Sequence, residues 1–253
     1  MLILAYCNKI TVLASQISPV EISFKLSSKS NSPECFHYKP RLHISDFLGN
    51  TDGLIAFSGH VGSDLANCLF ADFKEAYSRT DYNEIKELLK PDWFVEATRI
   101  CSQYVDVFGM DNFFIEIQLF DKENLPVSIV IAECLREISK KTGIKKIATP
   151  DVHYVFPEDA SDQRVLLCSL MEATLKNIKD KIEKSEDFGL SVFFKSNKYY
   201  LPTLEEMLAL HEKDEIDNCQ LIDSMCENYS MIKEPSIPNF DCPNKLSQIL
   251  YLR

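Results

Sequence analysis

The chain has 253 residues, and 45% of them are apolar, so it can bury the core of one large α/β domain or of two small ones. A formal net charge of −11 argues against a basic surface for sequence-independent nucleic-acid binding and leaves room only for a local basic groove. The sequence contains no apolar run long enough to span a bilayer.

The first thirty residues have strand-like composition at 10–15 and 20–28, followed by a polar loop. The opening run MLILAYCNKITVLA is apolar, but it has neither the basic start nor the small-residue cleavage site of a signal peptide. We expect this run to contribute a strand.

Further along the chain, predicted strands and helices alternate three times. The strands are 54–57, 112–120 and the apolar run that ends at Asp151, and the helices that follow them start near Ser63, span 125–143 and lie within 157–173. Two more helices are expected over 81–90 and 91–107. This order is typical of βα units around a parallel sheet or barrel.

The last third of the chain changes character. Residues 192–202 read as an extended segment, and Thr203 and Glu206 have the spacing of a capping box. A final amphipathic helix is expected over 214–229. Residues 233–244 hold three prolines and are predicted to form an extended exit segment.

The nine cysteines are scattered along the chain and form no CxxC pair. An odd count with irregular spacing is unlike the disulfide framework of a small secreted domain. Cys101 and Cys134 lie in apolar helical runs, where a thiol behaves as a small hydrophobic group. We therefore expect reduced thiols and a cytoplasmic protein.

Polar side chains gather where two predicted strands end. His60 follows the first strand in Ser-Gly-His, and Asp151 and His153 follow the third, two positions apart. In an extended segment such a pair points to one side, and imidazole with carboxylate is a ligand set of Zn²⁺ or Mn²⁺. From spacing alone, local hydrogen bonding of each histidine and a turn role for Asp151 are the commoner alternatives.

Glu116 is the single acid inside the apolar strand FFIEI. Burial of a carboxylate is costly unless it is paired or bound to a metal, so a buried Glu116 would mark a site. A position facing outward at a sheet edge, or pairing with an arginine, is an equally good interpretation. His211 lies at a predicted helix end, where a cation suits the helix dipole, and no site role is expected for it.

Taken in order, these segments resemble the PHP domain of the bacterial DNA polymerase III alpha subunit, over roughly residues 35–245. The resemblance depends on the collinear series FHYKPRLHISDFL, DGLIAFSGHVGSDLANCLF, NFFIEIQLFDKENLP, IATPDVHYVFPEDASDQRVLLCSLMEATL and LPTLEEM. It implies an α/β fold, a distorted β/α barrel with a multinuclear metal cluster at one end. In some members that cluster hydrolyses phosphoesters as a 3′–5′ exonuclease.

Carried over residue by residue, the resemblance implies metal ligation by His60, Asp151 and His153, with Zn, Mn or Mg as the divalent metal. It places Glu116 in the shell behind the ligands. Pro150 stands where the polymerase branch usually has Asn.

The family's opening His-x-His, Asp-His and Gly-x-Glu motifs should precede FHYKPRL, and they are absent from this sequence. The expected organisation is therefore an incomplete barrel lacking its opening strands. A partial PHP domain would span 1–232, with 1–34 matching the family least well, and an exit segment toward a polymerase core would span 233–253.

The leading hypothesis is a fragment of a DNA polymerase III alpha subunit that acts in DNA replication and reaches DNA through the intact polymerase. Such a fragment should not polymerise alone, because the catalytic palm is missing, and its hydrolysis should be weak or absent. One alternative is a non-catalytic binding module that pairs with a complementary polymerase fragment or docks on a polymerase. The other is an independent metal phosphoesterase that recruits further ligands, such as His37 or His43.

Overall fold

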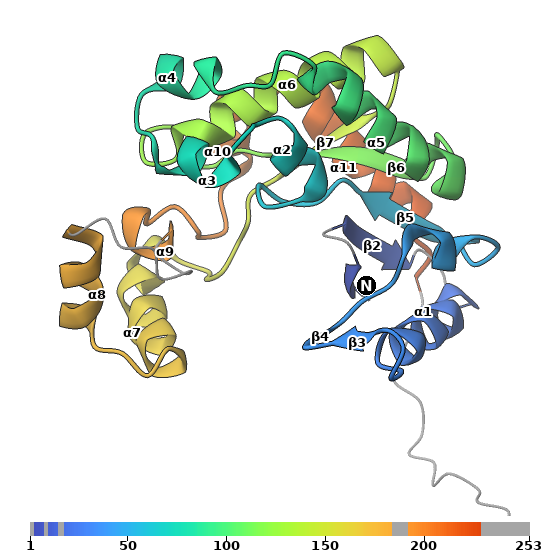
Figure 1. Ribbon diagram of the computed structural model, residues 1–253, viewed down its shortest axis with the longest axis horizontal. Helices are drawn as coiled ribbons and strands as arrows, with labels where there is room; N and C mark the ends of the chain where they lie inside the picture. The colour runs from blue at the N-terminus through green and yellow to red at the C-terminus, as the bar shows by residue number, and fades with distance from the viewer. Residues whose placement is uncertain (1–2, 8–9, 15–17, 184–191, 229–253) are drawn as a thin grey trace, which may run out of the picture.

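The computed structural model describes residues 3–7, 10–14, 18–183 and 192–228 (Figure 1). The predicted exit segment, residues 233–253, lies outside the described residues. Within the described ranges, no helix combines the length and the apolar character needed to cross a membrane.

A five-stranded sheet organises the molecule, in the order β1-β2-β5-β6-β7. Its strands are β1 (Ile3–Cys7), β2 (Ile10–Ala14), β5 (Leu54–Phe57), β6 (Phe113–Gln118) and β7 (Lys146–Thr149). The last three strands are parallel, and β2 joins them antiparallel through β5. A second, two-stranded sheet pairs β3 (Phe36–His37) with β4 (Lys39–Pro40).

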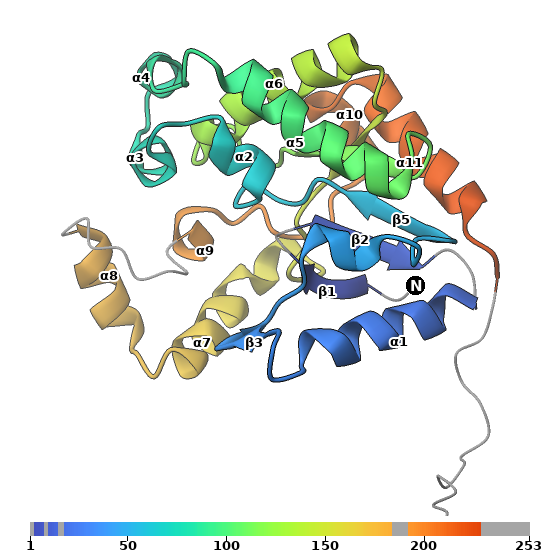
Figure 2. The ribbon, with the colours of Figure 1, turned by 45° about the vertical axis from the view of Figure 1, so that its right-hand side comes forward.

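Eleven α-helices and two 3₁₀ turns are described around the sheet (Figures 1 and 2). They are α1 (Ser18–Ser30), η1 (Ile44–Phe47), α2 (Asp64–Cys68), α3 (Phe73–Ser78), α4 (Tyr82–Glu87), α5 (Trp93–Phe108), α6 (Pro126–Thr142), η2 (Pro157–Asp159), α7 (Ala160–Leu170), α8 (Leu175–Glu183), α9 (Val192–Lys195), α10 (Leu204–Leu210) and α11 (Lys213–Met225). In both views α7, α8 and α9 lie together, apart from α5 and α6.

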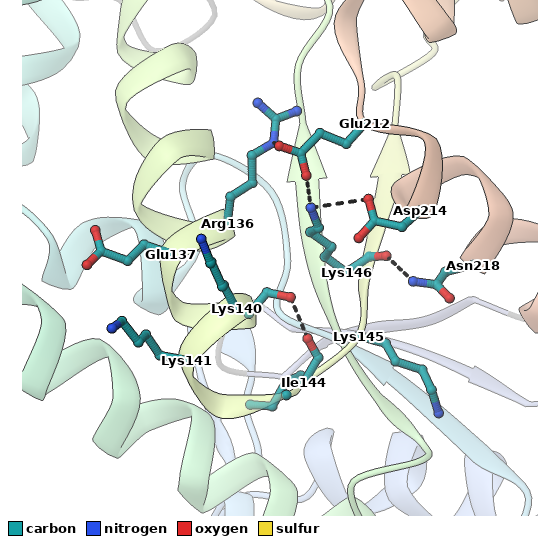
Figure 3. A pocket seen from close by; sticks show the side chains of 12 residues that line it. Arg136, Glu137, Lys140, Lys141, Ile144, Lys145, Lys146, Glu212, Asp214 and Asn218 are labelled. Atoms are coloured by element: carbon teal, nitrogen blue, oxygen red, sulfur yellow. Dashed lines mark hydrogen bonds and ion pairs between the residues drawn. The ribbon is translucent and has the colours of Figure 1, made fainter.

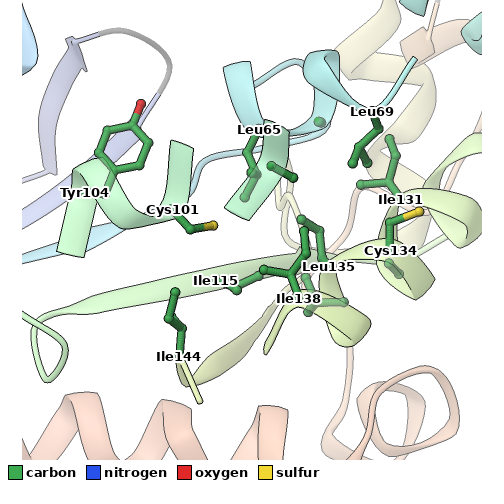
Figure 4. Packing of buried hydrophobic residues seen from close by; sticks show 14 of the residues in the cluster. Leu65, Leu69, Cys101, Tyr104, Ile115, Ile131, Cys134, Leu135, Ile138 and Ile144 are labelled. Carbon is green, nitrogen blue, oxygen red and sulfur yellow. The ribbon is translucent and has the colours of Figure 1, made fainter. Parts of the chain in front are cut away.

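Both faces of the parallel strands are buried, because alternate side chains point to opposite sides. One face packs under α2, α5 and α6, and Figure 4 shows Ile115 of β6 among Leu135 and Ile138 of α6. The other face packs against α11, where Phe114 shares a cluster with Ile222. These two layers account for the unbroken apolar character of the strands.

Several predicted helix boundaries are confirmed, together with the capping interactions that the sequence predicted there. The hydroxyl of Ser63 accepts a hydrogen bond from the Ala66 amide and caps α2. Thr203 and Glu206 form the predicted capping box of α10. The long helix α6 ends at Gly143, whose φ of 78° lies in the left-handed region that favours glycine.

Two local predictions are wrong. Residues 20–28 do not form a strand but lie in α1, because Ile22 and Leu26, four residues apart, pack on one side against the main core. The segment 192–202 is extended only in its second half, since its first residues form α9.

The general α/β class is confirmed, with three parallel strands flanked by helices. In the part of the chain that the structure describes, the strand order runs from β1 to β7 without closing, so a barrel is not shown. The parallel strands β5, β6 and β7 are the framework on which the candidate site lies.

Candidate functional site

The carboxyl ends of β5, β6 and β7 meet at one edge of the sheet, and hydrogen bonds between the strands fix this edge. The hydroxyl of Ser58, after β5, accepts a hydrogen bond of 2.9 Å from the Glu116 amide in β6. The Gln118 side chain accepts one of 3.1 Å from the Val61 amide. Carboxyl ends of parallel strands are where α/β proteins place their functional residues.

Glu116 is buried in this edge, with 8% of its surface exposed. Its Oε1 accepts a hydrogen bond of 2.8 Å from the Thr149 hydroxyl at the end of β7. Its Oε2 is buried and has no hydrogen-bond partner among the described residues. Of the two interpretations of this acid, the structure supports the buried one, and the partner is a threonine rather than an arginine.

This environment favours the protonated form of Glu116. Burial raises the pKa of the carboxyl above its usual value, and the nearby charge of Asp151 raises it further. Hydrogen bonding from Thr149 and from the Gly59 backbone lowers the pKa without cancelling the effect of burial. A buried acid with an unsatisfied oxygen is the type of group that a cation or a proton stabilises.

Asp151 and His153 lie together, with 3.2 Å between Asp151 Oδ1 and His153 Nε2, although Asp151 does not have the extended backbone from which this convergence was predicted. About a third of each side chain is exposed, 35% and 34% respectively, so the pair borders solvent. Asp151 has a φ of 49°, in the left-handed region that non-glycine residues rarely adopt. Aspartate tolerates this conformation better than most residues, and such backbone often accompanies functional positions.

The ring of His153 contacts two aromatic side chains. Its centroid lies 4.6 Å from that of Phe193 and 5.5 Å from that of Tyr199, both edge-on. The His153 amide also donates a hydrogen bond of 2.8 Å to the Tyr199 carbonyl. The 193–199 segment therefore determines where the imidazole points.

His60 lies near Glu116, just after β5. Its Nδ1 accepts a hydrogen bond of 2.9 Å from the Gly62 amide, and its ring lines a small cavity with Gly59, Glu116 and Gln118. A Cβ added to Gly62 would approach His60 Cε1 to 2.8 Å, so a larger residue at position 62 would clash with the imidazole ring. Across the described ranges, no group of three or more His, Cys, Asp or Glu side chains is arranged to hold a metal. Glu116 is thus close to both His60 and Asp151, but the three predicted ligands do not form one such group.

A second polar centre, which the sequence did not reveal, lies at the opposite end of β7. A groove of about 750 Å³ runs between α6 and the start of α11 (Figure 3). Within it Lys146 forms ion pairs with Glu212 and Asp214, and its ammonium lies 3.5 Å from Glu215. Three other lysines line the groove: Lys140, Lys141 and Lys145.

Glu215 is the centre of this network, with none of its side chain exposed. Arg136 donates two hydrogen bonds to it, of 2.6 and 2.9 Å, and His211 Nδ1 lies 2.9 Å from Glu215 Oε2. Burial alone would raise the pKa of Glu215, but Arg136 and His211 outweigh burial and lower the pKa to about 2.

His211 lies at the end of α10, as predicted, and it is buried there. Its second ring nitrogen, Nε2, lies 2.9 Å from the carbonyl oxygen of Leu119, the residue that follows β6. His211 caps the end of α10 and Glu215 lies in the first turn of α11, so their contact depends on the junction between two helices and no helical spacing in the sequence indicated it.

No family model matches the chain. The chain is similar to curated proteins named DNA polymerase III subunit alpha. The one from Thermus aquaticus is 29% identical over an alignment of 252 positions, which covers 96% of this chain and 18% of that protein. The one from Saccharopolyspora erythraea is 29% identical over 222 residues (87% and 16%), and the one from Aquifex aeolicus is 26% identical over 250 residues (98% and 19%).

The chain therefore spans less than a fifth of the length of these relatives. The similarity extends over most of this chain and supports a relationship to the DNA polymerase III alpha subunits.

Proposed function

We propose that the chain corresponds to most of the PHP domain of a DNA polymerase III alpha subunit, and that it serves DNA replication as part of such a polymerase. The observation that carries this proposal is the similarity to those subunits over 87% to 98% of the chain. Three parallel strands with intervening helices are compatible with a β/α barrel. Polymerisation by this chain alone is not expected, since it spans less than a fifth of those subunits.

The second part of the proposal is a divalent metal site, with Zn²⁺, Mn²⁺ or Mg²⁺, at the edge formed by β5, β6 and β7. Asp151 and His153 are ligand types that suit these ions, and their polar atoms converge within 3.2 Å. The unsatisfied Oε2 of Glu116 supports a cation nearby. His60, which lines a small cavity together with Glu116, would be the third ligand.

The metal would polarise a phosphodiester and activate a water molecule. Other residues would keep Glu116 in place beside the metal. The Thr149 hydroxyl donates a hydrogen bond to the Glu116 carboxyl, and the Ser58 hydroxyl accepts one from the Glu116 amide. With three candidate ligands, the expected hydrolysis is weak or absent. Strong cleavage of a single-stranded 3′ end that His153→Ala abolishes would contradict this expectation.

The test of the metal site is binding of Mn²⁺ or Zn²⁺, measured by equilibrium dialysis and by the shift of the thermal unfolding midpoint. We expect metal to stabilise the wild-type chain by about 2–3 kcal/mol at a hundredfold excess over Kd. Asp151→Asn and His153→Gln should lose this gain. His43→Gln, a surface histidine that hydrogen-bonds Ser45, is the matched control and should keep it. Equal metal binding by all three variants would contradict the proposed ligands.

A non-catalytic binding module is the second candidate. The observation in its favour is the exposed apolar stripe of α7, where Val165, Leu166 and Leu170 are 57%, 57% and 73% exposed. Such a stripe suits docking on a larger polymerase assembly. Protein that is monodisperse and unfolds cooperatively by itself, and that gains no stability from a complementary polymerase fragment, would count against this role.

A further inference from the structure

The turn that follows β6 contains an acid whose side chain is completely buried, Asp121. The amide and the side-chain nitrogen of Asn124 donate hydrogen bonds of 3.2 and 2.8 Å to its carboxylate. The hydroxyl of Ser196, 75 residues away in the sequence, donates a third of 2.5 Å. The turn is thereby tied to the segment that precedes α10.

Ser196 also fixes the residues that follow it. Its oxygen accepts a hydrogen bond of 3.0 Å from the Lys198 amide, and the Lys198 ammonium lies 3.7 Å from Asp121. Tyr199 follows this tight 196–198 turn, and its side chain is buried, with 1% exposed. Asp121 and Ser196 therefore determine where Tyr199 lies.

Arg164 of α7 holds the same segment from its other side. Its guanidinium donates hydrogen bonds to the carbonyl oxygens of Phe193, at 3.2 Å, and Ser196, at 3.4 Å, and to the side chain of Asn197. The 193–199 segment is thus clamped between Asp121 and Arg164.

This clamped segment is the one that contacts the His153 ring. Phe193 and Tyr199 contact the imidazole edge-on, and the Tyr199 carbonyl accepts the His153 amide hydrogen. The Tyr154 hydroxyl accepts a hydrogen bond from the Tyr199 amide, which is a second link between the segment that contains His153 and the clamped segment. Among the described residues, the two aromatic rings that contact the His153 imidazole both belong to the clamped segment.

We propose that Asp121 is a positioning residue, which acts through Ser196 and Tyr199 to hold the His153 imidazole beside Asp151. The inference rests on the proposed metal site, because it states how one of its ligands is oriented. Ligand-orienting partners of this kind act by reducing the freedom of the ligand before the metal arrives.

The site requires a carboxylate at position 121. Ser196, Asn124 and Lys198 present only donors to it, and an ionised carboxylate is an acceptor at every lone pair. Burial by itself raises the pKa of Asp121, but the hydrogen bonds from Ser196 and Asn124 together bring it below the usual value. An asparagine at this position would direct its own N–H₂ group at one of these donors.

The experiment compares Asp121→Asn and Ser196→Ala with the wild type and with Asp111→Asn. Asp111 is a surface acid, 87% exposed, that pairs with Lys145 and serves as the matched control. The readout is the ring-proton resonances of His153, assigned by their loss in His153→Gln. In the wild type they should carry the shift that two edge-on aromatic rings impose. Asp121→Asn and Ser196→Ala should lose most of that shift, and Mn²⁺ affinity should fall by about tenfold.

Circular dichroism and the unfolding midpoint show which variants remain folded. Ser196→Ala removes a single hydroxyl and keeps the test available if Asp121→Asn does not fold. His153 resonances in either folded variant that match those of Asp111→Asn would overturn the inference. If the wild type binds no Mn²⁺ but the resonances move as expected, the metal proposal fails while the positioning of His153 by Asp121 stands.

Discussion

The two ends of the parallel strands each bury a glutamate, and the two glutamates behave oppositely. Glu215, beside the start of β7, is bonded by Arg136 and His211, and its pKa is lowered to about 2. Glu116, near the carboxyl edge, has one hydroxyl partner and an unsatisfied oxygen, and burial raises its pKa. Both glutamates are buried, but the partners of Glu215 favour its charged form, whereas the surroundings of Glu116 favour its neutral form.

This difference separates structural burial from burial that indicates a site. A fully paired buried charge ties elements together and leaves no capacity for a ligand. An incompletely paired one retains a desolvation cost that a proton or a cation can relieve. The incomplete glutamate is the one that lies next to His60 and Asp151.

The largest effect is expected from Glu215→Ala. Removal of the carboxylate takes away the buried partner of the Arg136 guanidinium and of the His211 ring, and it leaves Arg136 only the half-exposed Glu212 at 3.7 Å, so the free energy of unfolding should fall by about 3–5 kcal/mol. Urea unfolding followed by circular dichroism measures this loss. The control is Glu212→Gln, whose side chain is 53% exposed and whose loss should matter much less. Equal effects of the two substitutions would show that the buried carboxylate of Glu215 contributes no more to stability than the exposed carboxylate of Glu212, which also pairs with Lys146.

An intermediate effect is expected from acid. Glu215 has a folded-state pKa of about 2, below its usual value of 4.5, so its contribution to stability is present above pH 4.5 and is lost as the pH falls toward 2. Unfolding midpoints measured from pH 6 to pH 2 should decline over this range. The decline should be shallower in Glu215→Gln, and identical profiles would contradict the assigned role of the carboxylate.

The smallest effect, and one of opposite sign, is expected from Glu116→Gln in metal-free protein. Because burial raises the folded-state pKa of Glu116, its favourable contribution is present below its usual pKa and is lost as the pH rises through the folded-state value. The glutamine cannot ionise, so at neutral pH it should stabilise the fold by about 1 kcal/mol, and near pH 4 by much less. Thermal unfolding at the two pH values, each with EDTA, measures the difference. If Glu116→Gln destabilised the metal-free protein at neutral pH, burial would not be disfavouring the ionised form of Glu116.

Features that depend on neighbouring residues were predictable from the sequence. The alternation of strands and helices, the Ser63 cap, the Thr203–Glu206 capping box and the convergence of Asp151 with His153 all arise within a few residues. Hydrophobic periodicity and short-range hydrogen bonds are encoded locally, so they can be read before the fold is known. The strand-like composition of 20–28 was misleading, because packing of Ile22 and Leu26 against the core decided in favour of a helix.

The polar networks were decided by the tertiary structure alone. Arg136 meets Glu215 across 79 residues, Asp121 meets Ser196 across 75, and Glu116 meets Thr149 across 33. Whether each buried acid is completed by a cation, by hydroxyl and amide donors or by a single threonine depends on which distant segment packs beside it. The sequence by itself determined where the acids and histidines stand along the strands, and the packing of the strands and helices determined which of them are satisfied, since the desolvation of a charge depends on all of its neighbours in space.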